Sequence, residues 1–412
     1  MLVYKNNLDK LYQYLIIFLG LLMPLTVSGA KIVASLVVLI WLLTGNYKEK
    51  ILKVINNPIA KYSLLFFSIH LAGLLWTEDM VWGLHIVKKM IDFGIFLPVF
   101  LVLFYKDNIR FYIGAFLISI VFTQILSLSI LFEFIEPFKN ASSESPTPFM
   151  SSISHGPFMA FAFYLFSRLV YSSEYSWLSK SLFFLLAMLS VVGIFTTNGR
   201  AGQVVYFVLI FIMFFQHYGL KLKTFSNFFY LSLCTVILAL SFSPVFKDRV
   251  SMAISEVNNF NEKSLNAQKG TSVGLRLAMA QNSFEIIKKD LIFGVGTGDF
   301  KNEYSAINKI NSPELPATHN PHNMYILLLS QLGLIGLISL LVLFLKMILI
   351  SRKMEPSFAK DIGLALPVLF LIINFSDSYL LGHFTTFLFI YFSAIVFSDS
   401  IDEKNTCNNS EV

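Results

Sequence analysis

The chain has 412 residues, of which 56% are hydrophobic and 14% are charged, and its formal net charge is +6. Its apolar residues form runs long enough to cross a bilayer, which excludes a set of soluble domains. Short alternating segments would instead indicate a membrane β-barrel. The cations lie in the links between apolar runs and form no continuous basic face, so we expect no nucleic acid partner.

The apolar runs predict an all-α polytopic membrane protein with about twelve transmembrane helices, each of roughly 20 residues. The first run follows two lysines and ends in small residues near Gly29. It therefore fits either a cleaved signal peptide or a retained helix, and we favour the retained helix. In chain order, the predicted spans begin near Leu11, Ala30, Ala60, Ile91, Phe111, Pro157, Ser181, Gly202, Asn227, Met324, Gly363 and Leu380.

The links between spans alternate between cation-rich and cation-poor. Because lysine and arginine favour the cytoplasmic side, the alternation places both termini in the cytoplasm. We therefore expect four segments: spans one to nine in residues 1–243, a large outer loop in 244–322, spans ten to twelve in 323–398, and a polar cytoplasmic tail in 399–412. The cation-rich links contain Lys48, Lys50, Lys53, Lys61, Lys106, Arg110, Arg168, Lys180, Lys221, Lys223, Lys346, Arg352, Lys353 and Lys360.

The outer loop is roughly eighty residues long, which is too long for a passive link. Apolar residues at helical spacing from Leu275 to Ile286 predict an amphipathic helix near the membrane face, with Thr271 or Ser272 as its N-cap. A glycine-rich turn follows at residues 294–298. No Gly-Lys-Ser/Thr sequence accompanies it, so these glycines indicate close backbone packing rather than a nucleotide-binding loop.

Several cations lie on the outer side, where the charge bias does not explain them. Arg200 follows the predicted seventh span, and its guanidinium fits either lipid headgroups or phosphate oxygens. Arg276 lies in the first turns of the loop helix, as either an ordinary surface residue or a contact for a bound anion. Lys88 and Lys89 precede the fourth span and fit the same two roles.

The segment Thr318-His319-Asn320-Pro321-His322-Asn323, here called the histidine segment, opens directly into the apolar run that begins at Met324. An imidazole accepts protons near neutral pH, so His322 is a candidate general base, with His319 as its competitor. A histidine at a membrane surface can also be a hydrogen-bonding anchor. The proline between the two histidines opposes one regular helix, and no ligand set is completed nearby, so we expect no metal.

The two cysteines do not indicate a further site. Cys234 falls inside a predicted span, and Cys407 falls in the polar tail. This placement implies neither a disulfide nor a thiolate metal site. Sugar-binding aromatic residues are not distinctive in so apolar a chain, although Trp76 and Trp82 are placed to line a groove on the outer side.

His322-Asn323, nine further residues and then Gly333-Leu334-Ile335-Gly336 resemble the signature of the O-antigen ligases. The resemblance extends to Thr197-Asn198-Gly199-Arg200 and to residues 276–300, and thus covers about the second half of the chain. At Gly199 the chain departs from the family, in which a serine is common before the arginine. The resemblance implies a fold similar to class C glycosyltransferases.

The resemblance also implies a reaction, in the bacterial inner membrane with its active site on the periplasmic face. A glycan would pass from an undecaprenyl diphosphate donor to lipid A-core, with inversion and without a metal or other cofactor. His322 would be the general base, and Arg200 and Arg276 would bind the diphosphate, with Lys88 and Lys89 as further candidates. The supporting residues would be His319, Asn320 and Asn323, which shape the loop entrance or hydrogen-bond the sugar.

Three other activities share these features. An O-antigen polymerase would use the same donor with a second lipid-linked glycan as acceptor. A protein O-oligosaccharyltransferase would modify a polypeptide hydroxyl, although no peptide-binding appendage is evident. A lipid-linked glycan flippase would place ionisable groups inside its spans. In this chain the charges concentrate at span ends and in the outer loop, with His70 and His383 as exceptions.

Overall fold

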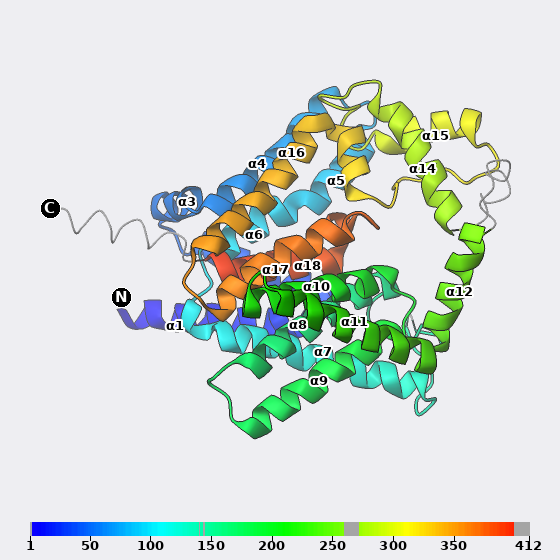
Figure 1. The fold of residues 1–412 in the computed structure, drawn as a ribbon. Helices are drawn as coiled ribbons and strands as arrows, with labels where there is room; N and C mark the ends of the chain where they lie inside the picture. Colours follow the sequence, from blue (N-terminus) through cyan, green and yellow to red (C-terminus); the bar gives the residue numbers. More distant parts are fainter. Residues whose placement is uncertain (1, 140, 143–144, 259–271, 399–412) are drawn as a thin grey trace. The chain divides into compact units, whose positions relative to one another are not determined.

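The structure is a computed structural model that describes residues 2–139, 141–142, 145–258 and 272–398. All regular secondary structure in these ranges is helical (Figure 1). The tail predicted to be cytoplasmic, Cys407 and Thr271 lie outside the described residues. The helices are α1 (Leu2–Leu22), α2 (Val27–Leu43), α3 (Tyr47–Asn56), α4 (Pro58–Ala72), α5 (Met80–Ile91), α6 (Leu97–Phe100), α7 (Ile109–Leu131), α8 (Ser152–Tyr171), α9 (Trp177–Phe195), α10 (Arg200–Tyr218), α11 (Leu222–Phe242), α12 (Pro244–Asn258), α14 (Ser272–Ile287), α15 (Phe300–Asn311), α16 (Met324–Lys353), α17 (Phe358–Ile373) and α18 (His383–Phe397).

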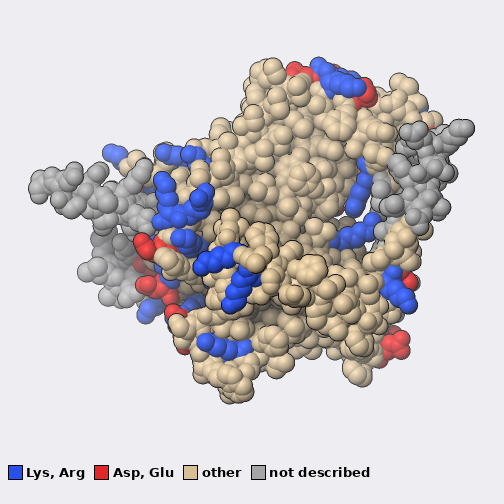
Figure 2. All heavy atoms as spheres, in the orientation of Figure 1, with Lys and Arg blue, Asp and Glu red and all other residues tan. Residues whose placement is uncertain are grey.

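The predicted all-α polytopic membrane protein is confirmed at this level. Six helical stretches among the described residues are long and apolar enough to cross a bilayer. The count of twelve stays a prediction, because several other apolar helices are shorter, among them α2. Figure 2 shows a face that is largely uncharged, with Lys and Arg side chains in small groups. The six stretches are Pro58–Trp76, Lys106–Leu131, Trp177–Phe195, Arg200–Tyr218, Leu222–Phe242 and Met324–Lys353.

The chain forms two compact units that interleave in sequence. Unit 1 contains residues 1–34, 107–258 and 355–365, and unit 2 contains residues 35–106, 259–354 and 366–412. This division follows packing, whereas the four segments expected from the sequence follow membrane topology. The outer loop contributes to both units, since α12 belongs to unit 1 and the helices α14 and α15 belong to unit 2.

In unit 1, α8 packs against both α9 and α10 (Figure 1). Glycines allow the first turns of α8 and α10 to approach closely. A Cβ at Gly202 would lie 2.4 Å from the Cα of Gly156, and a Cβ at Gly199 would lie 2.4 Å from the carbonyl oxygen of Ser152. The departure from the family at Gly199 therefore has a physical reason, because a serine side chain at this position would collide with the backbone of α8.

In unit 2, α16 runs beside α4 (Figure 1). Helix α16 is kinked at Gly333, whose φ of 60° and ψ of −157° are outside the range of other residues. The kink accommodates the outer loop, because the Leu334 amide donates to the Leu291 carbonyl oxygen at 2.8 Å. A Cβ at position 333 would lie 2.2 Å from the Ile292 oxygen. The first glycine of the signature thus fastens the outer loop to α16.

The glycine-rich turn is fixed in a similar way between α16 and the α4–α5 connection. The Thr297 hydroxyl donates to the His70 carbonyl oxygen at 2.8 Å, and the Gly298 amide donates to the Gln331 side-chain oxygen at 2.9 Å. Asp299 accepts from the amides of Glu78 and Asp79, each at 2.8 Å. The prediction that these glycines allow close backbone packing is confirmed.

A helix is present at the predicted position, α14, with Ser272 as its first residue, whereas its place near the membrane face stays a prediction. Its buried face includes Ile286, which packs with Phe300 and Tyr304 of α15 and Leu327 of α16. Sequence analysis did not predict α15. Together α14, α15 and α16 form a small apolar core that holds this part of the outer loop above the start of α16.

Candidate active site

The histidine segment ends at a well-formed helix start. Asn323 is the N-cap of α16, and its side-chain oxygen accepts from the amides of Tyr325 and Ile326 at 2.9 and 3.1 Å. His322 precedes this cap with a φ of 52°, a left-handed conformation that non-glycine residues adopt rarely. Its amide donates to the Asn320 side-chain oxygen at 3.0 Å, which helps to hold this conformation. Strained backbone of this kind persists where the surroundings enforce it, and it clusters at functional sites.

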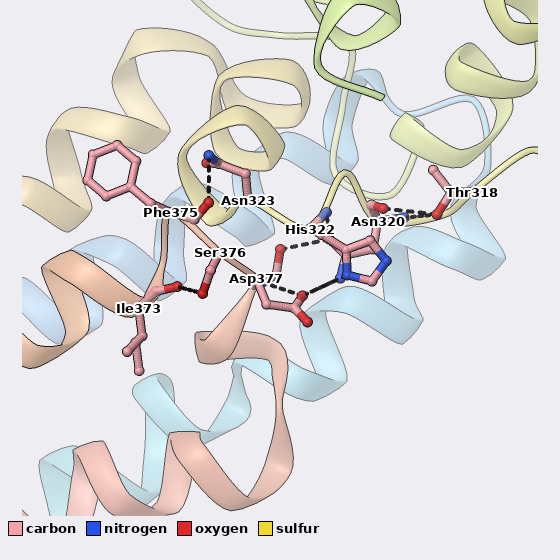
Figure 3. A network of polar contacts seen from close by, with 9 residues as sticks. Thr318, Asn320, His322, Asn323, Ile373, Phe375, Ser376 and Asp377 are labelled. Carbon is pink, nitrogen blue, oxygen red and sulfur yellow. Dashed lines mark hydrogen bonds and ion pairs between the residues drawn. The ribbon is translucent and has the colours of Figure 1, made fainter. Parts of the chain in front are cut away.

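His322 faces a carboxylate from the connection that follows α17. Its Nδ1 lies 3.2 Å from Oδ1 of Asp377 (Figure 3). The His322 side chain is 38% exposed, whereas that of Asp377 is 17% exposed. The imidazole is therefore open to a substrate, while the carboxylate lies mostly beneath it.

The surroundings of Asp377 favour its charged form. Burial raises the pKa of the carboxyl, but the hydrogen bond and charge of His322 outweigh this effect, so the pKa is below its ordinary value. The Ser378 amide and the Asn320 side-chain amide also donate to Oδ1, at 2.7 and 3.1 Å. A carboxylate only accepts hydrogen bonds, so Nδ1 of His322 carries a proton. Nε2 is then the nitrogen that can accept a proton from a substrate.

Asn320 connects both sides of this pair. Its side-chain oxygen also accepts from the Ser378 hydroxyl at 2.8 Å. The Thr318 hydroxyl donates to the Asn320 carbonyl oxygen at 2.9 Å and accepts from the Asn320 amide at 3.1 Å (Figure 3). Asn323 donates to the Phe375 carbonyl oxygen at 3.2 Å. Both asparagines therefore fix the shape of the loop, which is one of the two roles expected for them.

His319 has different surroundings from His322. Its ring meets the ring of Trp82 edge-on, with centroids 5.6 Å apart, and Trp82 stacks on His85 at 4.8 Å. The Lys301 ammonium lies 4.7 Å from the centroid of the Trp82 ring. We call these four residues, Trp82, His85, Lys301 and His319, the Trp82 cluster. Trp82 therefore contacts the histidine segment, whereas the groove expected on the outer side stays a prediction.

The Trp82 cluster lies in a field of positive charge. Burial lowers the pKa of His319, and the charges of Lys89, His322 and Lys301 lower it further. Burial also lowers the pKa of His85, followed by the charges of Lys89 and Lys88. Lys88 and Lys89, the two lysines expected at an anionic site, therefore lie near this cluster: both act on His85, and Lys89 also acts on His319. At neutral pH the lysines supply the positive charge, and His85 and His319 are neutral.

The two arginines lie in different units. Arg276 is exposed on α14 in unit 2, and its charge acts on Tyr379, two residues after Asp377. Burial of Tyr379 nevertheless raises the pKa of its hydroxyl. Arg200 is half-buried at the first position of α10 in unit 1. The structure thus brings Arg276, Lys88 and Lys89 toward the histidine segment within unit 2, and it describes Arg200 only within unit 1.

Sequence reasoning missed Asp377. The residue falls in the cation-poor outer link between the last two predicted spans, and no motif marks it. An acidic residue at the edge of a span is costly without a partner, which was the one available signal. Asn374, three residues before Asp377, is fully buried, and its carbonyl oxygen accepts a hydrogen bond from the Met324 amide at 2.9 Å. Sequence reasoning gave Asn374 no role either. Among the described residues, no group of three or more His, Cys, Asp or Glu side chains is arranged to hold a metal ion.

Comparison with protein families gives one match. The family model described as O-antigen ligase matches residues 183–341. The matched range contains Arg200, Arg276, His322 and both glycines of the signature, whereas Asp377 lies beyond it. The resemblance to O-antigen ligases predicted from the sequence is thereby confirmed. A search of curated proteins found no match to the chain.

Proposed function

We propose that this chain, which resembles the O-antigen ligases, is an inverting membrane glycosyltransferase. It transfers a glycan from undecaprenyl diphosphate to a sugar hydroxyl of lipid A-core at the periplasmic face of the inner membrane. The single observation that carries the proposal is the His322–Asp377 pair, held by a strained backbone at the start of α16. A family of membrane-bound glycan transferases and an oriented imidazole at a helix start point to the same chemistry.

The reaction begins at the acceptor hydroxyl. Nε2 of His322 removes the hydroxyl proton while the acceptor oxygen bonds to the anomeric carbon of the donor. Asp377 keeps Nδ1 protonated and stabilises the imidazolium that forms, as the carboxylate of a catalytic triad does. The proton therefore ends on His322, and Asp377 stays ionised.

The leaving group departs from the opposite face of the sugar. The bond between the anomeric carbon and the diphosphate oxygen breaks, and its electron pair leaves with undecaprenyl diphosphate. Arg276 binds the diphosphate oxygens, and Lys88 and Lys89 add positive potential where negative charge grows. Arg200 stays a candidate for the diphosphate from the family resemblance alone. Attack opposite the leaving group inverts the anomeric centre. In this scheme the cationic side chains stabilise the charge and no metal is needed.

The Trp82 cluster is suited to the sugar next to the reacting bond. The neutral His85 and His319 can both donate and accept hydrogen bonds with sugar hydroxyls. His319 thus has a supporting role, distinct from that of His322.

An O-antigen polymerase remains the second candidate, because the family suggests ligase or polymerase activity. The test supplies purified protein in detergent with undecaprenyl diphosphate-linked glycan, with and without lipid A-core, and resolves products by gel mobility. Glycan-capped lipid A-core is the expected product. A lengthened lipid-linked glycan with unmodified lipid A-core would identify a polymerase. If neither product formed while the donor crossed the bilayer of a reconstituted vesicle, the protein would be a transporter.

A further inference from the structure

Unit 1 contains a large cavity that the proposed reaction does not use. The cavity has a volume of about 1060 Å³ and lies among α7, α8, α9 and the start of α17. All of its lining residues belong to unit 1, and they include neither Arg200 nor any residue of the histidine segment. The links that meet at its polar end are among the cation-rich ones, so the charge bias places this end at the cytoplasmic membrane surface.

One wall of the cavity is a continuous apolar stripe. Ile109, Ile113, Leu117 and Val121 line it from successive turns of α7. Twelve residues of helix cover about 18 Å. This length is close to half of the roughly 30 Å hydrocarbon thickness of a bilayer, which is the depth that one acyl chain occupies.

The end of the cavity is polar and carries a net positive charge. Its ionisable side chains with fixed charge at neutral pH are Arg110, Arg168, Lys360, Glu174 and Asp361, which sum to +1. Arg110 and Glu174 form an ion pair at 2.6 Å, and Arg168 pairs with Asp361 through Nη2. An anion with one negative charge would neutralise this end.

Arg168 has hydrogen-bonding capacity left over. Its Nε and Nη1 are buried and have no hydrogen-bond partner among the described residues. A buried donor without an acceptor costs free energy, and a guanidinium binds phosphate oxygens strongly. Gln216 steadies the arrangement, because its side-chain amide donates to the Asp361 carbonyl oxygen at 3.0 Å.

We propose that this cavity binds one anionic phospholipid of the cytoplasmic leaflet. An acyl chain lies along the stripe on α7, and the phosphate lies at the polar end near Arg110, Arg168 and Lys360. A soluble phosphate would leave the apolar wall uncovered, and a zwitterionic lipid would bring no net negative charge to lining residues that sum to +1. The site is separate from the proposed transfer reaction and does not depend on it.

Gly114 gives a direct way to test the site. It lines the cavity from α7, and a Cβ built on it meets no atom within 4 Å. Gly114→Trp therefore fills the cavity without a backbone collision, while Gly114→Ala leaves most of its volume and improves helix propensity. The pair separates loss of space from the mere loss of glycine.

The experiment is native mass spectrometry of the full-length protein in detergent, titrated with phosphatidylglycerol or with phosphatidylcholine of the same acyl chains. We expect one phosphatidylglycerol to bind about tenfold more tightly than phosphatidylcholine. Gly114→Trp should abolish this binding, Gly114→Ala should keep it, and Arg110→Gln with Lys360→Gln should bring the two lipids close to equal affinity. Equal binding of both lipids to the unaltered protein would overturn the proposal. If Gly114→Trp does not fold, unchanged lipid preference in the Arg110→Gln and Lys360→Gln variant would overturn it.

Discussion

Replacing Asp377 by asparagine removes the negative charge beside His322 but keeps the size and an acceptor oxygen of the side chain. The hydrogen bonds from Asn320 and Ser378 can therefore remain. The proposed mechanism needs the charge itself, because the imidazole becomes positive as it takes the acceptor proton. We expect Asp377→Asn to slow transfer while the protein stays folded.

The size of the effect follows from the geometry of the pair. The His322 side chain is 38% exposed and the Asp377 side chain is 17% exposed. The effective dielectric constant between them is therefore roughly 40, between the values for water and for pairs near a protein surface. Two unit charges 3.2 Å apart then attract by about 2.6 kcal/mol. Loss of this attraction in the transition state corresponds to about a hundredfold decrease in kcat.

The assay is single-turnover transfer from saturating lipid-linked donor to lipid A-core, with thermal unfolding in detergent as the measure of folding. Glu78→Gln is the control, because it removes an exposed carboxylate from the same unit. If Asp377→Asn transferred glycan within threefold of the unaltered protein, the charge of Asp377 would have no part in the reaction. An equal loss in Glu78→Gln would show that the effect is one of net charge.

Arg276→Lys keeps the charge of the side chain but loses the planar guanidinium fork. We therefore expect kcat/KM for the diphosphate donor to fall by about tenfold while thermal stability is unchanged. An unaltered kcat/KM would remove Arg276 from the diphosphate site. Gly333→Ala should lower the free energy of unfolding by about 2 kcal/mol or more, because alanine does not adopt the backbone conformation of Gly333. Gly114→Ala should not lower it, so equal melting temperatures of the two variants would refute this prediction. His85 and His319 have lowered pKa values in the folded protein, so the unfolded chain takes up protons first and stability should fall as the pH drops below about 6.5. The His85→Gln, His319→Gln variant should lose less stability between about pH 7 and pH 5, as thermal unfolding would show. Transfer by the purified protein should persist in EDTA, and loss of activity that one metal restores would contradict the metal-free mechanism.

The parts of the candidate site that sequence reasoning predicted share one property: each is marked by a local pattern. The histidine segment, its helix and the following glycines form one signature, and the helix that carries Arg276 shows its own periodicity. Local patterns of this kind survive folding because hydrogen bonds within a helix and at its cap connect near neighbours. His322 therefore lies at the start of α16, as predicted.

Asp377 could not be found in the same way. It lies 55 residues after His322, and only packing of α16 against the end of α17 brings the two together. The Met324 amide donates to the Asn374 carbonyl oxygen, and the Tyr325 hydroxyl donates to the Leu371 carbonyl oxygen at 2.6 Å. Such contacts depend on tertiary structure, which periodicity does not encode.

The glycines show a second limit of sequence reasoning. The signature places Gly333 correctly, but its spacing does not reveal that the residue kinks α16 or that the outer loop fills the space of its missing side chain. Similarly, Gly199 reads as a departure from the family, and only the nearby Ser152 carbonyl oxygen explains it. A glycine that is needed for a close contact between two backbone segments is visible in the sequence, but the segment that it contacts is not.

The central claim is that His322 removes the proton from the acceptor hydroxyl. The most direct measurement compares single-turnover transfer by His322→Gln with that by His319→Gln, using the same donor and lipid A-core and checking each variant by thermal unfolding. Glutamine keeps hydrogen-bonding capacity but does not act as a base at neutral pH. The account predicts a loss of about a thousandfold or more for His322→Gln, with substantial activity in His319→Gln. Folded His322→Gln that transfers glycan as fast as His319→Gln would contradict it.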